Sequence, residues 1–397
     1  MSKISTEYDL IQKILNATQQ DDIHHENNIS LLSGLAGRLL FHWYASKSSF
    51  LDFDADKFQL QLEQLTEQSA LLGNTINFGY GISGFGWLME VLLSERDDGY
   101  DPHFNQDIEN LLTLELDKSQ QWSGDIEYVL GLSGIAIFAA RRLKQGCGLA
   151  LYELIVKHFK ELAVYDTDES CSWQVPPRSI YRLNKKHPDG PEYNLGLAHG
   201  VPAIICALLP AVKHPDVALQ ARKLISDGCN WLIKQKLAAN SAISSFSYCA
   251  GDQQPSRLAW CYGDLTIALT FARAGQALDR QDLLDFACDL GIHASQRRED
   301  TAMVHDAGLC HGSAGLMLIF QLLNQIIPKP EFIEASDYWL ENTLTRYEAH
   351  GIKGLYAYKS GEYVLNTGLL EGLSGIGLCL LARQGVSPDW ADALLLA

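Results

Sequence analysis

Two cysteines and a histidine stand at matching places in short glycine motifs of this sequence. Cys261 lies two residues before Gly263 in WCYG. Cys310 and His311 lie directly before Gly312 in CHG. Two thiolates and one imidazole suit zinc, and three protein ligands leave a tetrahedral position open, as in catalytic zinc sites. A helix N-terminus just after each glycine would also favour the thiolate form. The residue types therefore predict a zinc centre with one open position.

Further polar residues stand in or beside equivalent motifs. His199 lies directly before Gly200 in GLAHG, and it could be a fourth ligand, an acid/base residue or a hydrogen-bonded core histidine. Arg257 precedes Cys261 by four residues and Tyr262 follows it. Both side chains could donate to a developing anion. Simple packing, or an ion pair for the arginine, is the alternative for each.

A pair of carboxylates precedes a third motif. The segment DIEYVLGLSG carries Asp125 and Glu127 shortly before Gly131. A carboxylate at this place could orient an imidazole, as in other acid/base sites. The alternative is a solvated charge in a turn.

These motifs belong to a repeat that runs along the chain. A glycine, two residues, a small residue and then a strongly apolar run recur seven times. The first glycines are residues 34, 81, 131, 200, 263, 312 and 372, with steps of 47, 50, 69, 63, 49 and 60 residues. Equivalent positions of a repeat occupy equivalent places in a repetitive fold. Copies four to six therefore place the histidines, cysteines and tyrosine described above side by side.

The repeat predicts two kinds of helix. The run after each glycine is apolar on nearly every side, as in Leu316–Phe320, which is typical of a buried helix. Amphipathic segments with one apolar stripe lie between the copies. They are residues 6–18, 58–70, 106–116, 151–162, 216–236, 280–296 and 333–347. Seven buried helices shield one another only if they close into a ring, so we expect an all-α fold, an α/α toroid of seven inner and seven outer helices.

Composition excludes several classes of protein. The 397 residues are 47% hydrophobic and 20% charged, which is typical of a globular chain with a large core. A net charge of −17 disfavours nucleic acid as a partner. No apolar run approaches the length of a membrane span, and the N-terminus lacks the layout of a signal peptide, so we expect a cytoplasmic protein without membrane insertion. The nine cysteines include no CxxC pair and argue against a disulfide framework.

The motifs GLAHG (196–200), WCYG (260–263) and CHG (310–312) resemble those of the lanthipeptide cyclases, the LanC-like family. The resemblance implies a single LanC-like α/α toroid domain over residues 1–397, with one zinc ion held by Cys261, Cys310 and His311. It implies His199 as the acid/base residue, assisted by Arg257 and Tyr262.

Two departures from the family pattern concern other positions. The family's acidic residue usually stands where this chain has Glu127, and Asp125 lies two residues earlier, so both remain candidates. The family usually continues WCYG with x-Pro-Gly, whereas residues 264–266 are Asp, Leu and Thr. The second departure removes no predicted ligand.

The implied activity is the addition of a peptide cysteine thiol to dehydroalanine or dehydrobutyrine in a dehydrated precursor peptide. The product is a lanthionine or methyllanthionine ring, an antibiotic-type thioether. The resemblance also implies a dehydratase and an exporter as partners. Two alternatives remain open: addition of glutathione to dehydrated residues, and a non-catalytic peptide-binding scaffold that contains zinc.

The two longest repeat steps flank the fourth copy and contain residues 165–195 and 237–258. Long loops beside a site commonly serve binding. The first contains the densest basic cluster of the chain, Arg178, Arg182, Lys185 and Lys186. This cluster could hold an acidic part of a peptide, or it is a solvated loop.

Two rival readings are disfavoured. Residues 97–101, DDGYD, match the DDxxD pattern of terpene cyclases, but Gly99 and Pro102 predict a turn where that chemistry needs a continuous helix. A sugar-processing α/α barrel would need paired carboxylates at the rim, and no such pair recurs in the repeat.

Overall fold

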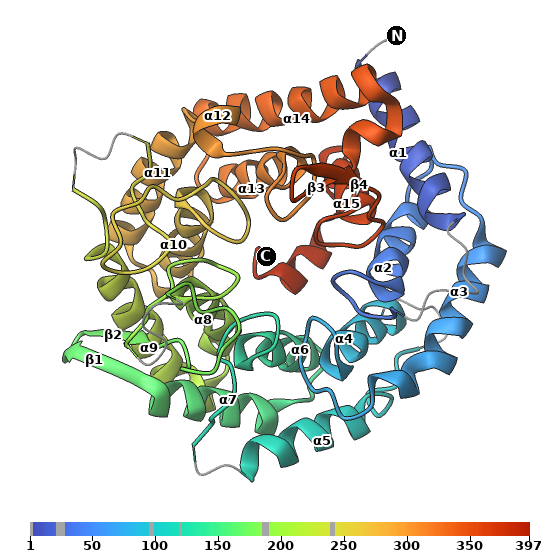
Figure 1. The fold of residues 1–397 in the computed structure, drawn as a ribbon. Helices are drawn as coiled ribbons and strands as arrows, with labels where there is room; N and C mark the ends of the chain where they lie inside the picture. The colour runs from blue at the N-terminus through green and yellow to red at the C-terminus, as the bar shows by residue number, and fades with distance from the viewer. Residues whose placement is uncertain (1–2, 21–27, 95–98, 119–120, 185–189, 239–242) are drawn as a thin grey trace.

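The computed structural model shows two concentric rings of helices (Figure 1). It describes residues 3–20, 28–94, 99–118, 121–184, 190–238 and 243–397. Among these residues the inner ring has seven helices: α2 (Leu35–Ser46), α4 (Ile82–Leu93), α6 (Leu132–Lys144), α8 (Val201–Leu208), α10 (Asp264–Leu278), α13 (Ser313–Ile326) and α15 (Leu373–Arg383). The outer ring also has seven: α1 (Lys3–Gln19), α3 (Ala55–Gln68), α5 (Gln106–Asp117), α7 (Leu149–Leu162), α9 (Pro215–Ile233), α11 (Gln281–Ser295) and α14 (Pro330–His350). This confirms the predicted α/α toroid.

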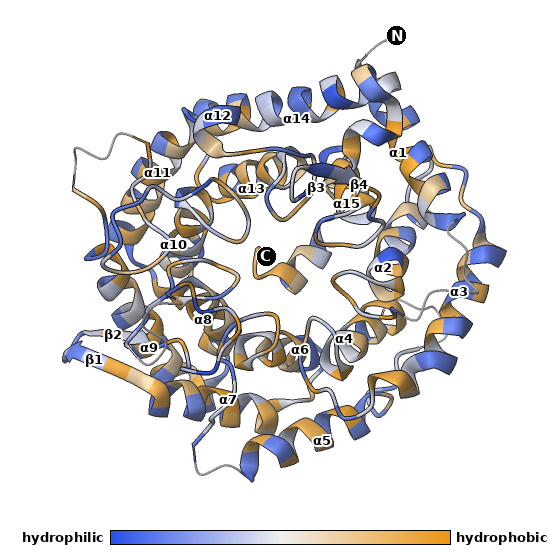
Figure 2. Cartoon of the chain, viewed as in Figure 1, coloured by the Kyte–Doolittle hydropathy of each residue, from blue (hydrophilic) through white to orange (hydrophobic). Residues whose placement is uncertain are grey.

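The two rings differ in how their side chains are buried. Residues Leu316–Phe320 of α13 are all fully buried, because other helices surround them on every side. In α7 the buried positions form one stripe that includes Leu151, Ile155 and Phe159. Each outer helix accordingly carries both polar and apolar residues (Figure 2). The distribution of apolar residues around a helix thus decides which ring the helix joins.

Backbone hydrogen bonds close the inner ring at the N-terminal ends of its helices. In every copy the carbonyl two residues before the first glycine accepts an N–H from a neighbouring copy. The bonds are Leu32 N to Gly79 O (3.3 Å), Gly79 N to Val129 O (2.9 Å), Tyr128 N to Ala198 O (3.0 Å), Ala198 N to Cys261 O (3.3 Å), Trp260 N to Cys310 O (2.7 Å), Cys310 N to Leu370 O (2.8 Å) and Leu370 N to Leu32 O (2.9 Å). This continuous circuit places equivalent residues of all seven copies around one mouth.

The glycines allow each turn to pack closely on itself. A Cβ atom at Gly200 would lie 2.1 Å from the carbonyl oxygen of Asn194, six residues earlier. At Gly263 the corresponding distance to the Arg257 carbonyl is 2.0 Å, and φ is +107°, a conformation that favours glycine. A side chain at either position would push the turn away from the circuit. The recurrent glycine is therefore a requirement of backbone approach.

Four short strands and one short helix were not predicted. Strands β1 (Ala163–Thr167) and β2 (Ser170–Trp173) form an antiparallel hairpin at the outer edge of the ring (Figure 1). Strands β3 (Ala357–Lys359) and β4 (Glu362–Val364) form a second hairpin, and α12 (Glu299–Ala302) is a single turn. These elements lie between outer and inner helices, in segments that the repeat leaves unspecified.

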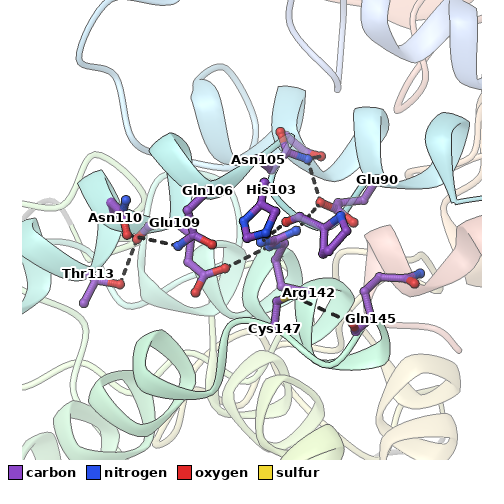
Figure 3. A network of polar contacts seen from close by, with 12 residues as sticks. Glu90, His103, Asn105, Gln106, Glu109, Asn110, Thr113, Arg142, Gln145 and Cys147 are labelled. Carbon is purple, nitrogen blue, oxygen red and sulfur yellow. Dashed lines mark hydrogen bonds and ion pairs between the residues drawn. The ribbon is translucent and has the colours of Figure 1, made fainter. Parts of the chain in front are cut away.

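A buried polar network joins α4, α5 and α6 (Figure 3). The Arg142 guanidinium donates to Glu90 and Glu109, at 2.9 Å each, and to the carbonyl of Pro102 at 2.8 Å. The side chains of Arg142 and Glu90 are fully buried, and Asn105 donates a further bond to Glu90 at 2.8 Å. Because every charge in it has a partner and the Arg142–Glu90 pair is fully buried, this network is structural.

The same region contains the DDxxD-like sequence. Asp97 and Asp98 lie outside the described residues, and the Asp101 carboxylate accepts the backbone N–H of His103 at 2.9 Å. Asp101 therefore closes a turn, as the nearby glycine and proline predicted. No helix among the described residues is both long and apolar enough to cross a bilayer.

The centre of the ring is occupied by the last residues of the chain (Figure 1). The 3₁₀ helix η5 (Asp389–Leu394) is largely buried, and the Leu394 carbonyl accepts the indole N–H of Trp260 at 2.9 Å. A cavity of about 970 Å³ lies beside this segment, between the C-terminal halves of inner helices. Its lining includes Leu143, Arg273 and Leu322 and none of the predicted site residues. The predicted site must therefore be sought at the opposite mouth.

Candidate functional site

The residue directly before each first glycine faces this mouth. All seven keep part of their side chain exposed, although their neighbours in the turns are mostly buried. They are Ser33, Tyr80, Leu130, His199, Tyr262, His311 and Glu371. The backbone circuit holds copies four, five and six next to one another, so His199, Tyr262 and His311 stand on one arc of the rim. The predicted neighbourhood is present.

Cys261 and Cys310 come together on this arc. The thiols of Cys261 and Cys310 are hydrogen-bonded to each other, and this bond lowers the pKa of Cys261. The same bond, together with burial, raises the pKa of Cys310. The nearby Arg257 charge favours the thiolate at both positions. Two sulfurs from residues 49 positions apart thus form a hydrogen-bonded pair near a cation.

His311 lies at the rim beside an acidic residue. Its Nε2 is 3.6 Å from Oδ2 of Asp306, whose side chain is buried. Asp306 accepts the backbone N–H of Gly308 at 3.0 Å and that of Tyr358 at 2.9 Å. A carboxylate held in this way fixes the orientation of a neighbouring imidazole, as it does around many metal-ligating histidines. Asp306 is a site residue that the sequence analysis missed.

The residues of this arc include the donor types that the predicted zinc ion would need. Two adjacent thiols with an imidazole on the next residue are the soft and borderline donors that zinc takes in proteins. The chemistry of Cys261, Cys310 and His311 therefore fits zinc. Among the described residues, however, no group of three His, Cys, Asp or Glu side chains is already arranged to hold a metal. The cysteines meet, and the histidine is turned toward Asp306.

His199 forms the most complete contact of the site. Its Nδ1 lies 2.8 Å from Oε2 of Glu127, and the two side chains are 16% and 4% exposed. The Glu127 carboxylate also accepts the backbone N–H of Val129 at 2.8 Å and that of Leu130. The two backbone N–H groups thus fix the carboxylate, and the carboxylate engages Nδ1 of His199. Nε2 is then the ring nitrogen that could meet another partner.

Glu127 and Asp125 were both candidates for this role, and the structure places Glu127 on the imidazole. The Asp125 carbonyl accepts the Trp122 indole N–H at 2.8 Å and the Leu132 N–H at 3.0 Å. Its Oδ1 atom is buried and has no hydrogen-bond partner among the described residues. No contact joins Asp125 to His199 in the described structure.

A structural slot in the repeat explains the place of Asp125. In six copies the residue six before the first glycine accepts, through its carbonyl, the N–H that follows that glycine. These residues are Asn28, Thr75, Asp125, Asn194, Asp306 and Asn366. Four of their side chains also accept the N–H two residues later. Asp306 occupies this slot in copy six, so a comparison of the copies could have found it.

Arg257 and Tyr262 lie beside the thiols, and no hydrogen bond joins the two side chains among the described residues. The Tyr262 hydroxyl accepts from the Asn194 amide at 2.9 Å, and its ring packs edge-on against Tyr248 at 5.1 Å. Burial raises the pKa of Tyr262, so its hydroxyl stays protonated near neutral pH. The charge of Arg257 acts on both Cys261 and Cys310. A cation and a neutral phenol thus flank the thiols.

Arg182 of the predicted basic cluster is not placed to bind a substrate. Arg182 is buried and donates to the carbonyls of Val175 at 3.0 Å and Gly190 at 2.6 Å. It therefore holds its own loop together, which corrects the expectation that it faces a peptide. Arg178 is exposed, and Lys185 and Lys186 lie outside the described residues.

The ring architecture and the thiol–imidazole rim define the class to which this protein belongs. The sequence model of the family described as Lanthionine synthetase C-like protein matches residues 25–395, and the chain belongs to this family. Among solved structures, one titled "Nisin cyclase" matches with a TM-score of 0.74, and the alignment covers 100% of this chain and 98% of that one. Sequence identity is 20%, so this similarity concerns the fold. No curated protein matches the chain in sequence.

Proposed function

We propose that this protein is a zinc-dependent cyclase that adds peptide cysteine thiols to dehydroalanine or dehydrobutyrine in a dehydrated precursor peptide. The observation that carries the proposal is the Glu127–His199 pair on the same rim as the adjacent thiols of Cys261 and Cys310. A thiol-binding centre and a positioned proton carrier are the two components that this addition requires. The solved neighbour titled "Nisin cyclase" supports the same reaction class.

Cys261, Cys310 and His311 would hold the zinc ion. Bound there, zinc would accept the substrate thiol at its open position and favour loss of the thiol proton at neutral pH. The contact between the two cysteine sulfurs and the carboxylate of Asp306 beside His311 support this assignment.

The other residues act on the carbon skeleton. When the thiolate adds to the β-carbon, the π electrons of the double bond move to the α-carbon and carbonyl as an enolate. Arg257 and the neutral hydroxyl of Tyr262 would stabilise this charge. His199 would then deliver a proton from Nε2 to the α-carbon, while Glu127 holds Nδ1. The product is a thioether ring of lanthionine or methyllanthionine type.

A mass-neutral cyclisation assay tests this function. The zinc-loaded protein is incubated with a dehydrated peptide that contains cysteine, with and without glutathione, and free thiols are alkylated before mass spectrometry. We expect the peptide mass to stay constant while the alkylated species disappear. Transfer of glutathione would instead show a glutathione-dependent donor reaction, and no change in either sample would indicate a binding scaffold. A dehydratase and an exporter are the proposed partners in the cell.

The zinc assignment has its own test. Cys310→Ala should lose at least about tenfold in zinc affinity, since it removes one of three ligands. Metal content after dialysis against a graded chelator measures this. Cys288→Ala, at a half-buried cysteine remote from the rim motifs, is the matched control. Equal zinc retention by both variants would refute the ligand assignment.

A further inference from the structure

An aromatic side chain covers the imidazole of His199. The rings of Tyr181 and His199 are stacked with centroids 3.9 Å apart and an interplanar angle of 18°. Among the described residues, the ring of Tyr262 is more distant, with its centroid 6.3 Å from that of His199 and an interplanar angle of 50°. Tyr181 comes from the loop before the fourth copy, and neither the motifs nor the repeat marks it.

Several hydrogen bonds hold the described residues around Tyr181, 175–184 and 190–192, in place. Its base is closed by the bond from Val175 N to the Glu192 carbonyl at 2.8 Å. The buried Arg182 crosses the loop to two backbone carbonyls, and the Glu192 carboxylate accepts the N–H groups of Leu183 and Asn184 at 2.9 Å each. Tyr181, directly before Arg182, is therefore held at the rim by hydrogen bonds among these described residues.

Tyr181 and Glu127 constrain the imidazole in two complementary ways. The carboxylate of Glu127 determines which nitrogen is engaged within the plane of the ring. The ring of Tyr181 lies within 18° of that plane and opposes rotation of the imidazole out of it. Together they leave the Nε2 edge as the part of His199 that can meet a substrate, in one orientation.

We infer that Tyr181 is a positioning residue that fixes the plane of the His199 imidazole and thereby the face on which the substrate α-carbon is protonated. The inference rests on the proposed cyclase function. In that reaction the S–H bond of the peptide cysteine and the C=C π bond break, and the S–Cβ and Cα–H bonds form. The proton lost by the thiol balances the proton gained at the α-carbon, without net oxidation or reduction. Its face of delivery sets the configuration of the new stereocentre.

The aromatic ring of Tyr181, and not its hydroxyl, carries this role. Burial, with a smaller contribution from Glu127, raises the pKa of Tyr181, so the phenol is neutral near neutral pH. The described structure shows no hydrogen bond from its hydroxyl to His199. A phenylalanine at this position should therefore preserve the positioning of His199, whereas a side chain without an aromatic ring should lose it.

The experiment uses the zinc-loaded full chain and a peptide with one dehydroalanine and one cysteine. Initial rates give kcat and KM after subtraction of the uncatalysed rate. Chiral chromatography of the hydrolysed product then gives the ratio of lanthionine diastereomers. The variants are Tyr181→Phe, Tyr181→Ala and Tyr181→Leu, with Tyr165→Ala on the remote strand β1 as the matched control.

For Tyr181→Ala we expect kcat to fall about tenfold with little change in KM, because the imidazole loses a stacking partner and its alignment. The minor diastereomer should appear in its product, because solvent can then protonate the opposite face. Tyr181→Phe and Tyr165→Ala should keep the wild-type rate and a single diastereomer. If Tyr181→Ala does not fold, as judged by circular dichroism, Tyr181→Leu is read in its place with the same expectation.

The outcomes separate this inference from the function on which it rests. If the wild-type protein forms no rings, the proposed function fails, and the inference fails with it. If the wild-type protein forms one diastereomer and the variant without an aromatic ring does the same at full rate, only the inference is overturned. A loss in Tyr181→Phe equal to that in Tyr181→Ala would also overturn it, since the hydroxyl would then be the acting group.

Discussion

Two histidines with hydrogen-bonded rings show how this fold separates structure from chemistry. His42 lies on the inner helix α2, and its side chain is fully buried. Its ring nitrogens are hydrogen-bonded to Thr18 at 3.0 Å and to Gln61 at 3.1 Å, both neutral partners. Burial, with a contribution from the Arg38 charge, lowers the pKa of His42 to about 3. This histidine stays neutral and acts as a polar core residue.

His199 stands at the mouth of the ring and has a different environment. Its partner Glu127 is a carboxylate, one ring face is covered by Tyr181, and part of the side chain reaches solvent. The Nδ1 atom of each histidine has a hydrogen-bond partner. The Nε2 atom of His42 is bonded to Thr18, whereas that of His199 has no partner among the described residues. The comparison teaches that the chemical role depends on the charge of the partner and on access to the remaining nitrogen.

The largest expected effect separates the two histidines by activity. His199→Ala should lower ring formation about 10³-fold, within the range of a lost general acid, and should leave zinc content unchanged. Turnover on the dehydrated peptide and metal analysis measure the two quantities. Metal loss in His199→Ala would make His199 a ligand and end the distinction drawn here.

The second prediction concerns stability. His42→Ala should lower the free energy of unfolding by about 3 kcal/mol, because it leaves a cavity and two buried polar groups without their partner. Urea denaturation followed by circular dichroism gives this value, and His199→Ala is the comparison. A larger destabilisation by His199→Ala than by His42→Ala would reverse the assignment of roles.

The third prediction is the pH dependence of stability. His42 stays neutral in the folded state down to about pH 3, whereas in the unfolded chain it takes up a proton near pH 6.5. The unfolded state therefore binds more protons between these values, and stability is lost as the pH falls. From pH 7 to pH 5 this one group should remove about 2 kcal/mol.

This contribution is obtained as a difference between proteins. His42→Gln keeps hydrogen-bonding capacity but cannot titrate, so its unfolding free energy should fall less steeply with pH than that of the wild type. Parallel slopes for the two proteins would show that His42 is protonated in the folded state and would remove one side of the comparison.

The smallest expected effect tests the carboxylate. Glu127→Gln should lower turnover about tenfold, because it replaces the charged partner of His199 by a neutral amide of the same shape. Asp125→Asn is the matched control, since Asp125 lies in a structural slot of the repeat and does not contact His199. Equal losses in the two variants, measured as kcat on the same peptide, would contradict the choice of Glu127.

The ring and much of the site could be predicted from the residues. Apolar runs at helical period can be buried only against one another, and the recurrent glycines mark where each run begins. Cys261 and Cys310 were therefore expected to meet because they hold the same position in neighbouring copies, and their sulfurs do meet. A repeat converts a long separation in sequence into adjacency in space.

Residues outside the strict repeat could not be placed in this way. Arg182 was expected to be a surface cation in a basic cluster, but its guanidinium donates hydrogen bonds to backbone carbonyls of its own loop. Tyr181 carries no motif, and its contact with His199 depends on the path of that loop. Loop paths follow from many weak contacts between remote segments, and no local period encodes them.

The order of residues alone determined the closed double ring, the mouth at which the inner helices begin and the arc that gathers the thiols and imidazoles. These follow from hydropathy period and from glycine spacing, which are local properties of the chain. Only the tertiary structure decided that Glu127 and not Asp125 engages His199, that Asp306 faces His311 and that Tyr181 covers the imidazole. The direction of a side chain depends on the turn that carries it and on the neighbours it meets, and these exist only once the ring has closed.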